Sequence, residues 1–166
     1  MPNKFLIAIA VVIVAMVALI AIPRIASPPT EHQQQLRIEY VRQNLTTIED
    51  GRLAASSADD TVINNDLSAT YHNLVGTQDE KKFEITSQEM DNLKGLILTT
   101  GFMGLPGENY PEKANSTNLT KYTLKLESGG NSKTIMWTDE KSSEVFVPGL
   151  IRNIGAQLDI IIDDHL

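Results

Sequence analysis

Hydrophobic positions first form one long block and then short periodic patterns. Residues 5–22 are all apolar, and as a helix they would measure roughly 27 Å, close to the hydrocarbon thickness of a bilayer. Secretory signals usually have a shorter apolar core, of about 7–15 residues. The block therefore predicts a transmembrane signal anchor over residues 1–24. Cleavage remains the alternative, because Ala18, Ala21 and Ala26 supply small residues near its end.

A polar stalk and then strand patterns follow this block. Residues 25–35 (IASPPTEHQQQ) contain proline and show no apolar periodicity, which is typical of a linker. The domain is predicted to occupy residues 36–166. Leu36, Ile38 and Tyr40 alternate with polar residues, as in a half-buried strand. A tight turn is predicted at Glu49-Asp50-Gly51. Weaker strands are predicted around Asn64-Asn65-Asp66 and through Tyr71, Leu74 and Val75, followed by a short strand at Phe83 and Ile85.

Two helices are predicted in the second half of the chain. Thr86 and Glu89 have the spacing of a capping box, in which each side chain bonds a backbone N–H of the first turn. Apolar residues then recur at helical spacing until Gly101. Pro148 suits the first turn of another helix. The apolar face of that helix comprises Leu150, Ile151, Ile154, Leu158, Ile161 and Ile162.

A hairpin is predicted between the two helices. Residues 122–126 and 133–137 are strand-like, and Ser128-Gly129-Gly130-Asn131 turns the chain between them. Residues 107–120 form a polar loop before this hairpin. The predicted fold class is α+β: an N-terminal transmembrane helix followed by a single extracytoplasmic domain of antiparallel β-hairpins with two packed helices.

Charge restricts the classes of partner. Removing Lys4 and Arg24 lowers the basic count from 14 to 12, so with 21 acidic residues the outer part has a formal charge of −9. This disfavours nucleic acid and anionic lipid headgroups as partners. Lys4 near the N-terminus favours a cytoplasmic N-terminus. The predicted location is thus the cell membrane, single-pass, with the domain extracytoplasmic.

The sequence shows no pattern of residues that indicates catalysis or metal binding. The chain has no cysteine, so disulfides and thiolate chemistry are unavailable. His32, His72 and His165 lack the spacing of a metal site, and residues 159–165 indicate a solvated helix end. Gly129-Gly130 leads into a strand, which fits a turn better than a phosphate-binding loop. We therefore predict no enzyme activity, catalytic residue, cofactor, metal or small-molecule substrate.

Two surface features remain open. Asn44, Asn115 and Asn118 each begin an N-glycosylation pattern, the last two in one polar loop, and chance occurrence is the alternative. Tyr122 and Trp137 could form a recognition surface. Paired aromatic residues across a hairpin more often belong to the core.

Residues 85–162 carry a family resemblance. The stretches ITSQEMDNLKGLI, GFMGLP, KYTLKLESGGNSKTIMW with TDE, and VPGLIRNIGAQL resemble the emfourin family of inhibitors of thermolysin-like metalloproteases. The resemblance implies a strand and helix, a hairpin and a closing helix, together with inhibition of such proteases. After Tyr40 the chain has VRQNLTT in place of the family's Gly-rich turn, so no inhibitory residue is assigned.

Two functional hypotheses follow. The first is a non-enzymatic, membrane-anchored, extracytoplasmic protein-interaction domain, for example a small accessory subunit of a larger membrane complex of the oxidase or monooxygenase type. The second is an emfourin-like inhibitor of metalloproteases at the cell surface. Both predict a protein partner.

Overall fold

A computed structural model of the protein describes residues 35–77, 79–105 and 109–166. Its elements in chain order are β1 (Arg37–Thr47), β2 (Leu53–Ile63), β3 (Ser68–Asn73), β4 (Glu80–Glu84), α2 (Ser87–Lys94), the π-helix η1 (Gly95–Thr99), the 3₁₀-helix η2 (Phe102–Gly104), β5 (Asn118–Ser128), β6 (Asn131–Thr138) and α3 (Gly149–His165).

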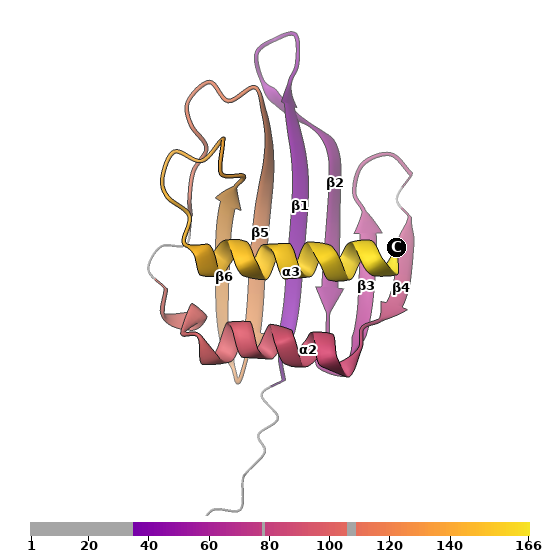
Figure 1. Ribbon diagram of the computed structural model, residues 1–166. Coiled ribbons are helices and arrows are strands. Elements are labelled where there is room, and N and C mark those ends of the chain that lie inside the picture. The colour runs from indigo at the N-terminus through magenta and orange to yellow at the C-terminus, as the bar shows by residue number, and fades with distance from the viewer. Residues whose placement is uncertain (1–34, 78, 106–108) are drawn as a thin grey trace, which may run out of the picture. The chain divides into compact units, whose positions relative to one another are not determined.

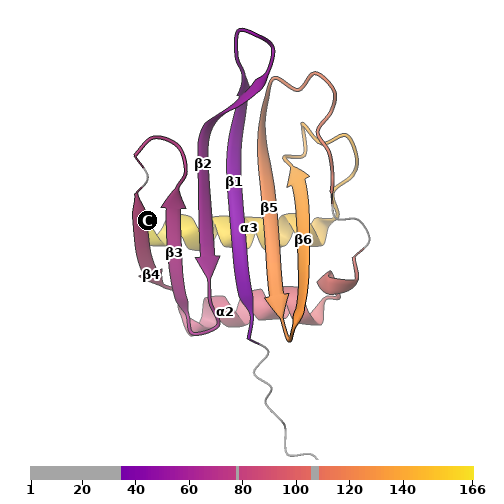
Figure 2. The same cartoon turned by 180° about the vertical axis from the view of Figure 1, so that it is seen from behind.

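The strands form one antiparallel sheet in the order β4-β3-β2-β1-β5-β6. Central strand β1 pairs with β2 on one side and with β5 on the other, so that Tyr40 lies opposite both Thr61 and Leu124. Figure 2 shows the face of this sheet that carries no helix. The side chains of one strand face alternate sides of the sheet, so this register decides which residues meet the helices.

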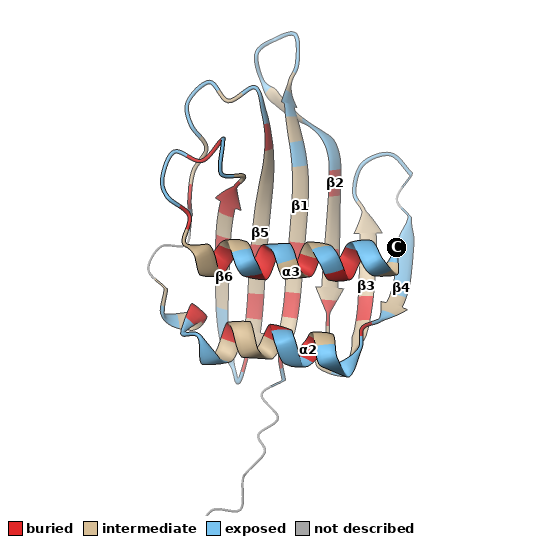
Figure 3. Ribbon diagram, in the orientation of Figure 1, coloured by how far each residue is buried: buried red, intermediate tan, exposed pale blue. Residues whose placement is uncertain are grey.

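Both α-helices cover the other face of the sheet (Figure 1). Helix α3 crosses the strands near their middle and α2 crosses them at one end, whereas the strands continue past α3 at the opposite end. Buried residues gather where helices and strands overlap (Figure 3). The stripe on α3 that packs there comprises Ile151, Ile154, Leu158, Ile161 and Ile162, which recur at helical spacing.

Local sequence signals explain where α2 begins and where its continuation through η1 ends. The hydroxyl of Thr86 accepts a hydrogen bond from the backbone N–H of Glu89, and the Glu89 carboxylate accepts one from the N–H of Thr86, as the predicted capping box requires. The helix widens into η1 and stops at Gly101, whose φ of 79° is left-handed. A glycine takes that conformation without the strain a side chain would add.

Two findings correct the predicted fold class. The domain is mostly β: the short strands that we expected as separate hairpins pair into one continuous six-stranded sheet, because β1 joins the front strands to β5. Within the described residues no helix is long and apolar enough to cross a membrane, which conflicts with the predicted single-pass transmembrane class. Residues 5–22, on which that prediction depended, lie outside the described part.

The weak strand predicted through Tyr71, Leu74 and Val75 is also corrected. Tyr71 belongs to β3, but β3 ends at Asn73. Leu74 and Val75 lie in the following turn, where they are exposed. The apolar side chains of this turn were therefore wrongly predicted to continue the strand.

Candidate functional site

An aromatic cluster lies on the helix-covered face of the sheet. The rings of Tyr122 and Trp137, paired across β5 and β6, are nearly parallel with centroids 5.2 Å apart, and the Tyr40 ring is 6.2 Å from each of them. Trp137 is 3% exposed. A Cβ atom at Gly155 would lie only 2.9 Å from Cζ2 of Trp137. The absent side chain at Gly155 therefore lets α3 approach the indole closely.

A hollow of about 230 Å³ opens beside this cluster, and we call it the aromatic hollow. It lies between the ends of β5 and β6 and the first turns of α3. Carboxylates and one guanidinium share its wall with the three aromatic rings. Its lining residues are Tyr40, Tyr122, Trp137, Thr138, Asp139, Glu140, Arg152, Gly155, Ala156 and Asp159.

Arg42 joins the sheet to α3 at the edge of the aromatic hollow. Its Nε donates to Oδ1 of Asp59 at 2.9 Å, and its Nη1 lies 3.2 Å from Oδ1 of Asp159 and 3.3 Å from Oδ1 of Asp163. The Tyr40 hydroxyl also donates to Oδ1 of Asp159, at 3.1 Å. Three carboxylates therefore surround one guanidinium, which leaves this corner of the molecule negatively charged.

Burial sets the direction of the pKa shift for Tyr40, Asp59 and Asp159, but not for Arg42. It raises the pKa of Asp159 and of Asp59 by more than the neighbouring Arg42 lowers them. It also raises the pKa of the Tyr40 hydroxyl, and the charge of Asp159 adds to that effect. For Arg42, burial acts to lower the pKa, but the hydrogen bond and charge of Asp59 outweigh it and the pKa rises. The guanidinium is therefore a fixed positive charge between acidic partners.

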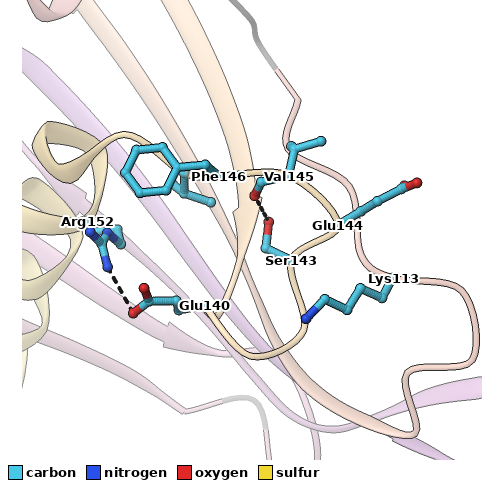
Figure 4. Close-up of a pocket in the computed structure, with 8 residues that line it drawn as sticks. Lys113, Glu140, Ser143, Glu144, Val145, Phe146 and Arg152 are labelled. Carbon is cyan, nitrogen blue, oxygen red and sulfur yellow. Dashed lines mark hydrogen bonds and ion pairs between the residues drawn. The ribbon is translucent and has the colours of Figure 1, made fainter.

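A second hollow, of about 270 Å³, adjoins the first and is drawn in Figure 4. We call it the loop hollow, because residues 143–147 form much of its wall, with Lys113, Glu140 and Arg152. The ion pair between Nη1 of Arg152 and Oε2 of Glu140, at 2.9 Å, belongs to the wall of both hollows. The guanidinium carbon of Arg152 lies 5.7 Å from the centroid of the Phe146 ring, within cation–π range.

The loop that carries Phe146 is held by hydrogen bonds. Oδ2 of Asp139 accepts from the backbone N–H of Thr120 at 2.9 Å, and Oδ1 accepts from that of Ser142 at 3.2 Å. The Ser143 hydroxyl donates to the carbonyl of Val145 at 2.6 Å. Even so, Phe146 is 76% exposed. Val145 beside it is also exposed, so two adjacent apolar side chains stand on a constrained loop, and aromatic side chains are enriched where proteins bind one another.

The candidate glycosylation residues lie together at the end of the sheet that extends past α3. Asn44 and Asn118 stand on the adjacent strands β1 and β5, and Asn115 lies in the preceding turn with φ 69°. All three are exposed. The Asn44 side chain, however, donates to the Ser57 hydroxyl at 2.7 Å and accepts from that of Thr120 at 2.8 Å. Glycosylation at these positions stays a prediction.

The histidines are dispersed. His32 lies outside the described residues. His72 is 3.4 Å from a carboxylate oxygen of Glu80, whereas His165 stacks on Phe83 and lies 3.4 Å from Glu89. In the described ranges no group of three histidine, aspartate or glutamate side chains is placed to hold a metal ion.

Sequence reasoning missed two parts of the site and left a third open. The helix end at 159–165 is not simply solvated, because Asp159 and Asp163 bind Arg42. Phe146 lies in the apolar stretch VFVP after a polar loop, a signal that could have been noticed. Trp137 belongs to the core, but Tyr122 lines the aromatic hollow as well as packing on Trp137.

No protein-family model matches this chain, and no curated protein sequence matches it. These findings do not bear on the resemblance to the emfourin family, which stays a prediction.

Proposed function

We propose that residues 35–166 form a non-enzymatic domain that binds a protein partner through the aromatic hollow and the loop hollow. The observation that carries this proposal is the 76% exposure of Phe146 on a hydrogen-bonded loop. Aromatic and arginine side chains are enriched among the residues that dominate binding between proteins. Phe146 in the wall of the loop hollow, with Arg152 over its ring, is an anchor of this kind.

The size of the hollows favours a protein over a small molecule as the bound species. Their volumes of about 270 and 230 Å³ both fall below the roughly 300–1,000 Å³ of pockets that enclose small-molecule ligands. Each has room for a side chain of a partner, and their shared wall places two such side chains close together. One short segment of a partner would thus fill both.

The experiment compares Phe146→Ser with a matched control. Full-length protein and both variants are expressed in the native host, cross-linked, purified by a tag and analysed by quantitative mass spectrometry. Leu74→Ser is the control, because Leu74 is another exposed apolar residue, 46% exposed, in the turn between β3 and β4. An anchor residue contributes at least about 2 kcal/mol, so Phe146→Ser is expected to weaken recovery of a stoichiometric partner about 30-fold.

Equal recovery with Phe146→Ser and wild type would refute the proposal. So would a wild-type protein that forms no stoichiometric cross-link at all. Loss of the partner in both variants would place the contact surface elsewhere and would equally contradict it.

The constrained loop also favours a second candidate, the inhibition of a thermolysin-like metalloprotease. A loop that is already ordered loses little conformational entropy on binding, and the apolar side chains of Val145 and Phe146 are exposed on it. Full-length protein at about 10 µM is expected to slow the hydrolysis of a chromogenic peptide by a thermolysin-like metalloprotease. The Phe146→Ser variant is expected not to slow it. Unchanged hydrolysis at that concentration would contradict the inhibitor hypothesis.

A further inference from the structure

The aromatic hollow has an uneven distribution of charge. Three carboxylates, those of Asp139, Glu140 and Asp159, line it against the one guanidinium of Arg152. Nη1 of Arg152 is bound to Glu140 and its guanidinium lies over the Phe146 ring (Figure 4), so this charge is already neutralised at the wall of the loop hollow. Arg42 contacts Asp159 as well, but it is shared with Asp59 and Asp163, so the remaining potential of the aromatic hollow is negative.

Two carboxylate oxygens in its wall lack partners. The hydrogen bonds to Asp159 from Tyr40 and Arg42 both go to Oδ1, and the Arg152 contact to Glu140 goes to Oε2. Among the described residues Oδ2 of Asp159 and Oε1 of Glu140 therefore accept no hydrogen bond. Both oxygens of Asp139, by contrast, are used by backbone N–H groups of its own loop and of Thr120.

The aromatic wall adds a second attraction for cations. Tyr122 is the half-exposed member of the cluster and carries its ring beside these carboxylates. Burial raises the pKa of the Tyr122 hydroxyl, and the charges of Asp159 and Asp139 raise it further, as expected for a hydroxyl beside these carboxylates. At exposed sites an aromatic face strengthens the binding of a positive group by about two- to fivefold.

We infer that the aromatic hollow takes a lysine or arginine side chain of the bound partner. This inference rests on the proposed function, because the side chain belongs to the segment whose apolar neighbour contacts Phe146. Its cationic end bonds Oδ2 of Asp159 and Oε1 of Glu140 and lies beside the face of the Tyr122 ring. A volume of about 230 Å³ suits one such side chain.

Trp137 makes the test direct, because it is the single tryptophan of the chain and lines the hollow. An acetylated, amidated pentapeptide with arginine flanked by two alanines on each side is titrated into full-length protein while tryptophan emission is recorded. The matched probe has citrulline, a neutral analogue of the same shape, in place of arginine. The arginine peptide is expected to give a saturable change in the millimolar range, and the citrulline peptide to bind about tenfold more weakly.

Protein variants locate the binding. Glu140→Gln is expected to weaken the arginine peptide about threefold, and Tyr122→Leu about threefold as well. Glu49→Gln is the matched control, because Glu49 is an exposed glutamate in the turn between β1 and β2 and lines neither hollow, and it should leave affinity unchanged. Far-ultraviolet circular dichroism checks that each variant is folded.

Three results would overturn the inference: equal affinity for the arginine and citrulline peptides, tighter binding of a glutamate counterpart, or no saturable change up to about 20 mM arginine peptide. If the peptide titration gives one of these results but Phe146→Ser still loses the cross-linked partner, the proposed function stands and only the inference of a cationic side chain is refuted. If the arginine peptide binds as expected but Phe146→Ser and wild type recover the partner equally, the aromatic hollow binds cations and the proposed protein-binding surface is wrong.

Discussion

Replacing Gly155 by alanine tests the close approach of α3 to the sheet. Gly155 lies within α3, where alanine would ordinarily be preferred by about 0.8–1.0 kcal/mol. Its added Cβ, however, would stand 2.9 Å from Cζ2 of Trp137 and 3.4 Å from the Tyr40 hydroxyl. The indole is 3% exposed, belongs to the buried core and stacks on Tyr122, so moving it away from α3 would disturb that packing.

The net effect is the difference between these two contributions. Overpacking a core costs about 1–3 kcal/mol, and subtracting the gain of about 1 kcal/mol in helix propensity leaves a destabilisation of roughly 0–2 kcal/mol. Gly95 provides the matched control, because its backbone is also helical, with φ −56° and ψ −50°, and nothing lies within 4 Å of its added Cβ. Gly95→Ala should therefore stabilise the protein by about 0.8–1.0 kcal/mol.

Urea unfolding followed by Trp137 emission measures both changes. The two variants should differ in free energy of unfolding by about 1–3 kcal/mol, with Gly155→Ala the less stable. Equal stabilisation by both substitutions would show that α3 moves away from Trp137 without cost, and the close packing inferred at this contact would be wrong. Because the aromatic hollow borders Gly155, the folded Gly155→Ala protein should also show a shifted emission maximum.

Three further substitutions test individual buried or paired groups. The Thr61 hydroxyl is fully buried and, among the described residues, has no hydrogen-bond partner, so Thr61→Val should raise the free energy of unfolding in urea by about 1 kcal/mol; a loss of stability would reveal a partner. Tyr40→Phe removes the hydrogen bond to the Asp159 carboxylate and should cost about 1.5–3 kcal/mol by the same assay, whereas an unchanged midpoint would refute that bond. Although burial acts to raise the pKa of Glu89, its hydrogen bonds from Thr86 lower it below 4.5 in the folded state. Its stabilising contribution is therefore complete above that pH and lost as pH falls through the lowered pKa. The stability advantage of wild type over Glu89→Gln should accordingly shrink in thermal melts between pH 6 and 3, and a constant difference would contradict the linkage.

Local signals predicted α2, α3 and the hairpin of β5 and β6 well. The capping box at Thr86 depends on side chains three residues apart, so it needs no knowledge of the fold. The turn at Gly129 and Gly130, both with positive φ, connects β5 and β6 as expected. Pro148 immediately precedes α3, one position earlier than the predicted first turn. In each case the physical cause lies within one turn or one hairpin of the residues concerned.

The site could not be predicted in the same way, because its contacts are distant in the chain. Arg42 and Asp159 are separated by 117 positions, and nothing near either residue indicates the other. Each is a charged residue, of a type that usually lies exposed on the surface. Only the crossing of α3 over β1 brings them together, and that crossing depends on the packing of the whole sheet. The continuous sheet itself was missed for the same reason, since pairing of β1 with β5 joins segments far apart in sequence.

The uncovered sheet face gives an independent reason to place binding at the two hollows. On that face Lys125 lies 2.9 Å from Glu127 and 3.7 Å from Glu39, and Arg37 lies 3.7 Å from Glu127 and 3.5 Å from Glu39. The charges of this cluster thus neutralise one another on the surface, where such pairs add little to binding. None of the exposed large apolar side chains among the described residues stands on a strand. A partner would therefore gain little buried apolar area on the open face, whereas Phe146 offers it such area beside carboxylate oxygens that lack partners.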